Sequence, residues 1–203
     1  MVALGMDDSQ YGSKSAANNK KRRARVLNTL VFSLFRFLSH NILMIAVLDN
    51  IRSIYNTASI FRTADGVGIE KLYLCGTTPT PINRMGNPRA EFTKVALGAE
   101  KTVPWEYISQ TYRCIDILKK QGYTVYVIEQ AKNSVPFYTV TSTAAKIHHT
   151  ALVMGNEIRG VSRGVLKRAD TILEIPMLGD KESLNVSVTF GIVAYHFAVN
   201  TLQ

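Results

Sequence analysis

From residue 42 onward, short apolar runs alternate with longer stretches whose apolar residues recur at helical spacing. The apolar runs, which predict β-strands, cover residues 42–48, 71–76, 123–129, 150–155 and 171–176. Runs this apolar are typical of strands buried on both faces of a sheet. The intervening stretches predict helices over residues 54–65, 106–121, 162–170 and 183–196. The alternation predicts an α/β domain, with a mostly parallel sheet flanked by helices.

The last helical stretch, SLNVSVTFGIVAYH, combines two contrasting features. Ser183 and Asn185 stand at its head, where polar side chains pack poorly but cap a helix well. The apolar residues that follow the helical spacing are Leu184, Val188, Ile192, Tyr195 and Val199. Elsewhere, Gly66 and Gly68 are expected to end the first helix, and Gly122 the second.

The region before the domain needs a separate interpretation. Residues 30–48 are apolar enough to resemble a membrane span, but Arg36 lies in their middle. A central arginine costs roughly 2.5–3.5 kcal/mol in a membrane helix, so an amphipathic helix followed by a buried strand explains the stretch better. No signal peptide is expected. The predicted organisation is a basic extension over residues 1–40 and one α/β domain over residues 41–203.

Positive charge is concentrated in that extension. The chain has 203 residues and a formal net charge of +9, and seven of its 24 Lys and Arg residues precede residue 41. The run NNKKRRAR is a local basic patch that predicts contacts with nucleic-acid phosphates, or else a solvated tail. Its candidate RNA-binding residues are Lys20, Lys21, Arg22, Arg23 and Arg25.

The positions of the cysteines and glycines disfavour two classes of functional site, a metal site and a nicotinamide site. Cys75 and Cys114 are far apart and have no Cys or His at metal-ligand spacing, which predicts a cytoplasmic protein without a metal site. A glycine-rich GxGxxG turn directly after a strand is absent, which disfavours a nicotinamide-dependent enzyme. Ligands of such sheets bind outside the carboxyl ends of the strands, where the polar segments of this chain gather.

Three of those segments carry a family resemblance. NIRSIYNTASIFRTADGVGIEKLYLCG, LVMGNEIRGVS and IPMLGDKESLNVSVTFGI resemble, in order, the three motifs of the SpoU/TrmH class of RNA ribose 2′-O-methyltransferases, within the SPOUT superfamily. The resemblance implies a deep trefoil knot near the C-terminus, S-adenosyl-L-methionine as methyl donor, and a homodimer.

The resemblance also implies the catalytic residues, which are Asn56, Arg62, Glu157, Ser183 and Asn185. By themselves, Asn56 and Ser183 would be helix caps and Arg62 a member of a structural ion pair. In the family, Arg62 corresponds to the proposed catalytic residue, and we expect Glu157 to pair with Arg62 or Asn56. Either a substrate phosphate helps Arg62 to lose a proton, or Arg62 stays charged and stabilises a developing alkoxide. The pKa of arginine, above about 12, favours the second account.

The cofactor and RNA contacts are likewise implied by the resemblance. Ile175, Met177 and Leu184 would wall the adenine, with Gly155 and Ser183 beside the cofactor and Glu129 reaching a hydroxyl. The loop NRMGNPRAEFTK adds Arg84 and Arg89 as candidate RNA-binding residues, although by itself the segment is equally well explained as a solvated connection. The predicted function is methylation of a ribose 2′-hydroxyl in tRNA or rRNA. The alternative is an inactive RNA-binding protein of the same fold, which the presence of every motif residue disfavours.

Overall fold

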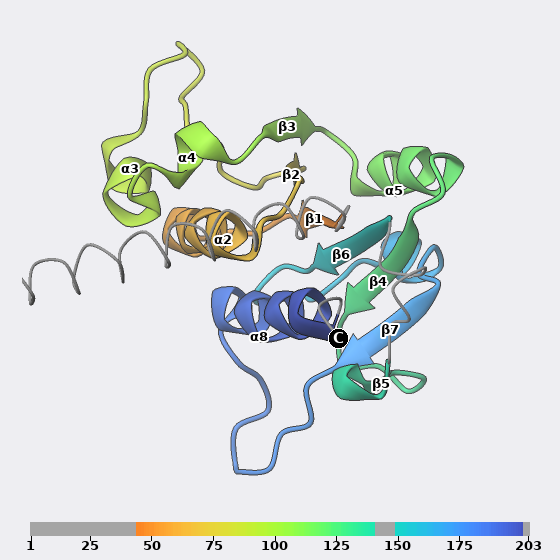
Figure 1. Cartoon of the computed structure of the whole chain (residues 1–203). Helices are drawn as coiled ribbons and strands as arrows, with labels where there is room; N and C mark the ends of the chain where they lie inside the picture. Colours follow the sequence, from red (N-terminus) through yellow and green to blue (C-terminus); the bar gives the residue numbers. More distant parts are fainter. Residues whose placement is uncertain (1–43, 141–148, 201–203) are drawn as a thin grey trace, which may run out of the picture. The chain divides into compact units, whose positions relative to one another are not determined.

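Seven parallel strands form one sheet in the order β3-β2-β1-β6-β4-β7-β5 (Figure 1). The computed structural model describes residues 44–140 and 149–200, so the predicted extension and its basic run lie outside the described residues. The strands are β1 (Met44–Asp49), β2 (Lys71–Cys75), β3 (Trp105–Ile108), β4 (Thr124–Ile128), β5 (Val135–Pro136), β6 (Thr150–Met154) and β7 (Thr171–Glu174). The predicted α/β class is confirmed. The knot stays a prediction.

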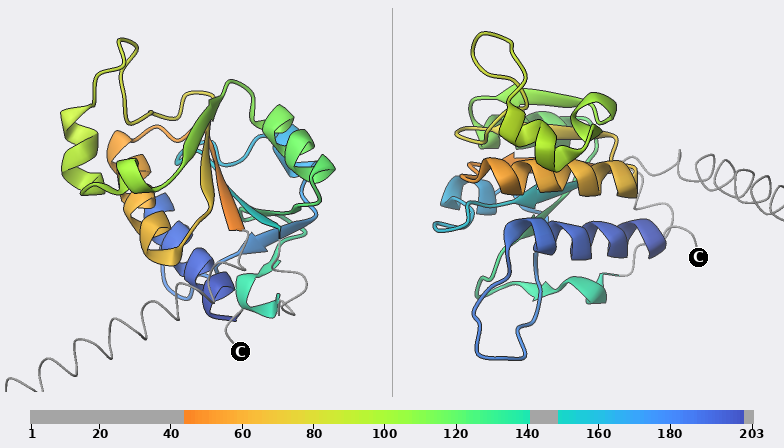
Figure 2. Two further views of the ribbon diagram at one scale, coloured as in Figure 1. Left: turned by 45° about the horizontal axis from the view of Figure 1, so that its top comes forward. Right: turned by 90° about the vertical axis from the view of Figure 1, so that its left-hand side faces the viewer.

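Helices cover both faces of the sheet, as Figure 2 shows. On one face pack α2 (Ile54–Val67), α3 (Ala90–Ala96), α4 (Ala99–Thr102) and α8 (Val186–Asn200). On the other face pack α5 (Thr111–Lys120) and α7 (Arg163–Leu166). A 3₁₀ turn, η1 (Phe137–Thr139), follows β5.

The interior strand β1 explains why the inner strands are apolar at consecutive positions. Its residues are all buried, and those before Asp49 alternate between two hydrophobic clusters. Met44, Ala46 and Leu48 face the α2–α8 side, whereas Ile45 and Val47 face the α5 side. Because side chains alternate across a strand, a sheet covered on both faces requires apolar residues at odd and even positions alike.

The edges of the sheet depart from the sequence prediction. The helix predicted over residues 106–121 begins only at Thr111, and residues 105–108 form the edge strand β3 instead. None of the β3 residues is buried, so the strand lacks the apolar signal that marked the others. The two-residue strand β5 was also not predicted. Gly68 ends α2 in the left-handed conformation, whereas Gly66 lies inside the helix.

Strand order determines which loops meet. The carboxyl ends of β1, β6, β4 and β7 are consecutive in the sheet. The segments that follow these strands therefore emerge along one edge, although they are up to 130 residues apart in the chain. This is the edge at which α/β sheets bind ligands.

Helix α8 provides a test of the core. Phe190 is fully buried, and we expect Phe190→Ala to lower the free energy of unfolding by about 3–5 kcal/mol, since it leaves a cavity between α8 and the sheet. Ile117 on α5 is 48% exposed, and Ile117→Ala serves as the control, with an expected loss of about 1 kcal/mol or less. Denaturant unfolding measures both values, and equal losses would contradict the packing described.

Candidate functional site

The carboxylate of Glu157 joins two of the polar loops. Glu157 lies in the turn after β6, which an antiparallel bridge between Asn156 and Gly160 closes. One carboxylate oxygen accepts the Arg52 N–H at 2.8 Å, and the other accepts the Ser53 N–H at 3.1 Å and the Asn56 side-chain amide at 2.9 Å. The start of α2 is thereby attached to the β6 turn.

These contacts also affect the ionisation of Glu157. Partial burial acts to raise its pKa, but the hydrogen bonds from Arg52, Asn56 and Ser53 together outweigh that effect and leave the pKa below its ordinary value of 4.5. A carboxylate with N–H donors on both oxygens is stabilised in its charged form. Glu157 is therefore a fixed anion rather than a proton carrier at neutral pH.

Asn56 connects all three motif segments. Ser53, rather than Asn56, caps α2, because its side-chain oxygen accepts the Asn56 N–H at 3.2 Å. The expectation that Asn56 is an ordinary N-cap is wrong. Its amide nitrogen donates to Glu157 at 2.9 Å, and its amide oxygen accepts from the Asn185 side chain at 3.1 Å. Asn56 thus uses both ends of its side chain to join the β6 turn to the start of α8.

Asn185 has a second role as the cap of α8. Its side-chain oxygen accepts the Ser187 N–H at 2.9 Å and the Ser187 hydroxyl at 2.7 Å. Ser183 therefore does not cap this helix, contrary to one of the expectations. It lies two residues earlier, in the wall of a pocket.

Arg62 lies apart from this cluster. It follows Asn56 by six residues on α2, which turns its side chain about 120° away around the helix axis. Its side chain is exposed, and the salt bridges among residues 44–140 and 149–200 join Lys71 to Glu106, Lys119 to Asp170 and Arg168 to Asp116. Of the two partners expected for Glu157, Asn56 is confirmed and Arg62 is not. Arg62 takes part in none of the salt bridges among the described residues, so an ion pair for this residue stays a prediction.

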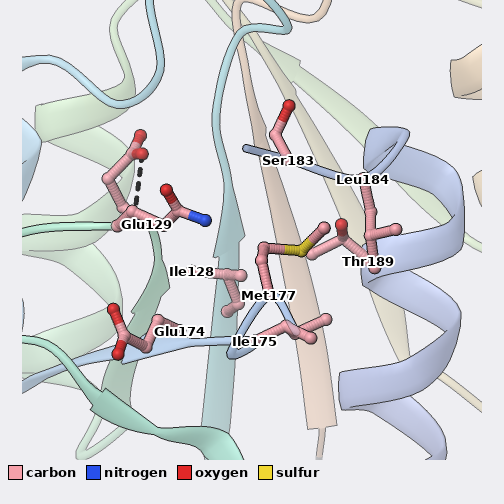
Figure 3. A pocket seen from close by; sticks show the side chains of 9 residues that line it. Ile128, Glu129, Glu174, Ile175, Met177, Ser183, Leu184 and Thr189 are labelled. Atoms are coloured by element: carbon pink, nitrogen blue, oxygen red, sulfur yellow. Dashed lines mark hydrogen bonds between the residues drawn. The ribbon is translucent and has the colours of Figure 1, made fainter. Parts of the chain in front are cut away.

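A pocket opens beside the cluster, between the ends of β4 and β7 and the start of α8 (Figure 3). Its lining residues are Ile128, Glu129, Gln130, Glu174, Ile175, Met177, Ser183, Leu184 and Thr189. Of the predicted cofactor residues, Glu129, Ile175, Met177, Ser183 and Leu184 line this pocket. The pocket offers apolar walls, with hydroxyl, amide and carboxylate groups at its margin.

Two predicted cofactor residues take part mainly in holding the β6 turn. A Cβ on Gly155 would lie 2.5 Å from the Val161 side chain, so glycine is required for close packing within the turn. The Glu129 carboxylate accepts the Val161 N–H at 2.7 Å and the Gln130 N–H at 3.0 Å. Figure 3 shows this carboxylate turned away from Met177. Each carboxylate oxygen already accepts one N–H of the protein, and the expectation that Glu129 reaches a ligand hydroxyl stays a prediction.

Several residues important to this geometry were missed by sequence reasoning. Asn156 donates to the Asn50 carbonyl at 2.6 Å and accepts the Ile158 and Arg159 N–H groups, which orders the turn. Gln130 donates to the Glu182 carbonyl at 2.7 Å and holds the segment before α8. The sequence offered one indication that Asn156 has a role, namely that this polar residue directly follows the loop glycine Gly155.

The described residues meet the requirements neither of a metal site nor of a membrane-spanning helix. Over residues 44–140 and 149–200, no three His, Cys, Asp or Glu side chains gather closely enough to hold a metal ion. The helices in these ranges are also too short or too polar to cross a membrane.

The parallel sheet, the pocket at its carboxyl edge and the joined polar residues define a particular class of α/β protein. Residues 43–195 match the SpoU rRNA Methylase family. The chain belongs to this family, and the resemblance seen in its sequence is confirmed.

Relatives of known name are similar over most of the chain. The tRNA (guanosine(18)-2′-O)-methyltransferase of Aquifex aeolicus is 32% identical over 152 residues, which are 75% of this chain and 67% of that protein. The 23S rRNA (guanosine-2′-O-)-methyltransferase RlmB of Neisseria meningitidis is 31% identical over 74% of this chain. The chain spans only 56% of the length of that relative.

Solved structures share the fold. The A. aeolicus TrmH/SpoU tRNA modifying enzyme superposes with a TM-score of 0.67 at 28% identity, covering 84% of each chain. An AdoMet-bound rRNA methyltransferase from Sinorhizobium meliloti superposes with a TM-score of 0.69 at 26% identity, covering 79% of this chain and 57% of that one.

The low pKa of Glu157 predicts a pH-dependent contribution to stability. Because its folded-state pKa is depressed, the contribution is present above pH 4.5 and is lost as the pH falls through the folded-state pKa. Glu157→Gln removes this titration, so the stability difference between wild type and variant should shrink between pH 6 and pH 3. Urea unfolding across this range measures it. Glu91→Gln, which changes an exposed carboxylate on α3, is the control, and an unchanged wild-type advantage at pH 3 would refute the assignment.

Proposed function

We propose that this protein transfers a methyl group from S-adenosyl-L-methionine to a ribose 2′-hydroxyl of a tRNA or rRNA nucleotide, in the cytoplasm. The observation that carries the proposal is the hydrogen-bonded chain Glu157–Asn56–Asn185, which joins the three motif segments beside the pocket. The named relatives methylate guanosine 2′-hydroxyls of tRNA and 23S rRNA, and they support the same reaction class here.

The pocket suits the methyl donor. Ile128, Ile175, Met177 and Leu184 supply apolar surface for a flat ring, and Gln130, Ser183 and Thr189 supply hydrogen-bonding groups at its rim. When bound, S-adenosyl-L-methionine supplies a methyl group already activated by its positive sulfur. The protein's own task is then to align a ribose hydroxyl with that group and to manage the hydroxyl proton.

Arg62 is the residue proposed to act on the substrate. Its exposed guanidinium is uncommitted to any salt bridge in the described part of the chain, so it is available to a molecule that arrives from outside. A guanidinium carries a delocalised positive charge that suits it to stabilise an anion. We propose that Arg62 stabilises the negative charge that develops on the ribose oxygen, while the hydroxyl proton passes to water. Proton loss assisted by a substrate phosphate is the competing account.

RNA would approach the carboxyl edge of the sheet from the β2 side. Arg84 and Arg89 lie in the loop after β2, and β2 adjoins β1 in the sheet. Both are proposed to contact phosphates, together with the basic run Lys20, Lys21, Arg22, Arg23 and Arg25. Phosphate contacts position the RNA, and the site beside the pocket then selects the ribose.

A homodimer is supported by the outward face of α8. The apolar residues whose helical spacing was noted in the sequence are not the buried ones: Leu184, Val188, Ile192, Tyr195 and Val199 are 38–50% exposed. The Tyr195 hydroxyl would lie 3.1 Å from a Cβ on Gly66, so this stripe borders the α2 face that carries Arg62. A continuous apolar stripe of this kind favours a self-complementary contact between two copies.

The catalytic assignment is tested with Arg62→Ala. We expect the rate of 2′-O-methylation, measured by mass spectrometry of nucleosides from treated RNA, to fall roughly 100-fold or more. Binding of S-adenosyl-L-methionine, measured by calorimetry, should be unchanged. Arg113→Ala, on the exposed face of α5, is the matched control. Unchanged methylation by Arg62→Ala would refute its role, whereas binding of RNA without any methylation by wild type would indicate an inactive RNA-binding protein.

The dimer is tested with Ile192→Glu. A charge in the middle of the α8 stripe should convert the protein to a monomer in sedimentation analysis, because burying an unpaired carboxylate is strongly unfavourable. Ile117→Glu places the same charge on exposed α5 and should leave the dimer intact. A wild-type monomer, or an unchanged dimer in Ile192→Glu, would contradict the proposed interface.

A further inference from the structure

The loop between β2 and α3 extends away from the sheet and the helices (Figures 1 and 2). Its outer part, residues 82–88, is closed at the base by an antiparallel bridge between Ile82 and Pro88. The polar cluster and the pocket contain none of these residues, and of the loop only Arg84 belongs to the RNA contacts proposed above. Hydrogen bonds within the loop nevertheless hold its backbone in a more defined conformation than a solvent-exposed connection requires.

Asn83 organises this 82–88 loop. Its side-chain oxygen accepts the Met85 N–H at 2.9 Å and the Asn87 N–H at 3.0 Å. Its backbone N–H donates to the Asn87 carbonyl at 2.8 Å, and its carbonyl accepts the Gly86 N–H at 3.0 Å. Gly86 adopts a positive φ of 80°, which the turn requires. With its backbone groups bonded to one another, the loop holds a defined shape.

The turn presents an apolar side chain beside positive charge. Met85 is 81% exposed, and Arg84 next to it is also exposed. Arg89 remains near the base of the loop, with its Nε donating to the Ile82 carbonyl at 3.4 Å. From Gly76 to Ala90 the sequence contains no acidic residue. The loop is therefore a hydrogen-bonded projection with the exposed thioether of Met85 beside Arg84, and neither Arg84 nor Arg89 is in a salt bridge with another described residue.

This combination fits single-stranded RNA better than a protein surface. Cations favour the phosphate backbone, and an exposed apolar side chain gains most by packing against an unstacked base. Methionine sulfur also packs favourably against flat aromatic rings. The loop leaves the sheet at the carboxyl end of β2, next to β1, so it lies on the same edge as Asn56 and Glu157.

We propose that the 82–88 loop is a preorganised RNA-contact element in which Met85 packs against an unstacked base near the target nucleotide and Arg84 contacts an adjacent phosphate. This inference rests on the proposed RNA methyltransferase function and extends it to how the substrate is held. Asn83 acts as a positioning residue, because it fixes the backbone that presents both side chains.

The two contacts have different dependence on salt, which allows them to be separated. The dissociation constant for bulk tRNA or rRNA, measured by fluorescence anisotropy at several salt concentrations, should rise roughly 2- to 10-fold in Met85→Ala without a change in the slope of log Kd against log salt. Arg84→Gln should reduce that slope by about 0.7, the value for one single-strand phosphate contact. Met85→Leu should restore tight binding, since it keeps the apolar contact.

Asn83→Ala tests preorganisation, because it keeps both contacting side chains and removes only their support. We expect roughly 2- to 10-fold weaker binding with the salt slope unchanged, from the cost of ordering the loop on binding. Ile117→Ala and Lys101→Gln are controls for exposed apolar and charged residues elsewhere, and they should bind as wild type does.

Methylation kinetics distinguish failure of this inference from failure of the proposed function. The loop variants should raise KM for RNA while kcat at saturating RNA and the affinity for S-adenosyl-L-methionine stay unchanged. If wild type methylates RNA and the variants match it in Kd, salt slope and KM, the inference is wrong and the function stands. If wild type neither binds nor methylates RNA, both are wrong.

Discussion

One carboxylate holds the functional edge of this protein together. Glu157 accepts hydrogen bonds from two consecutive backbone N–H groups before α2 and from the side chain of Asn56. These donors belong to a segment 100 residues earlier in the chain, and they would lack a partner if the β6 turn lay elsewhere. Once Glu157 is in place, Asn56 is oriented, and its amide oxygen is available to Asn185 at the start of α8.

The order of the strands makes this contact possible and divides the edge into two sides. Loops after β1 and β6 form the polar cluster, and loops after β4 and β7 form the pocket beside it. Glu129 links the two sides, because it directly follows β4 and its carboxylate accepts the Val161 N–H of the β6 turn. The polar cluster and the pocket therefore lie side by side on loops that share one sheet.

Several surface features of the described residues take no part in the core. Helix α8 is apolar around much of its circumference, with Phe190 and Phe197 in the core and Val188 and Ile192 exposed. The inward half packs in the core, whereas the outward half is partly exposed. Arg62, on the neighbouring face of α2, and the 82–88 loop likewise face solvent rather than the core.

The sequence by itself determined the α/β class, five of the seven strands and the three motif segments, because continuous apolar runs and short polar motifs are local signals. Five of the nine pocket residues followed only from the resemblance of those motifs to the family. The sequence did not reveal the edge strand β3, whose residues are half exposed and carry no apolar pattern. It also could not tell that Ser53 rather than Asn56 caps α2, or that Glu157 contacts Asn56 and not Arg62. Those choices depend on the direction in which each side chain leaves its helix and on which loops the strand order brings together. Both were decided only by the tertiary structure, because hydrogen bonds across 100 residues depend on where the chain has folded.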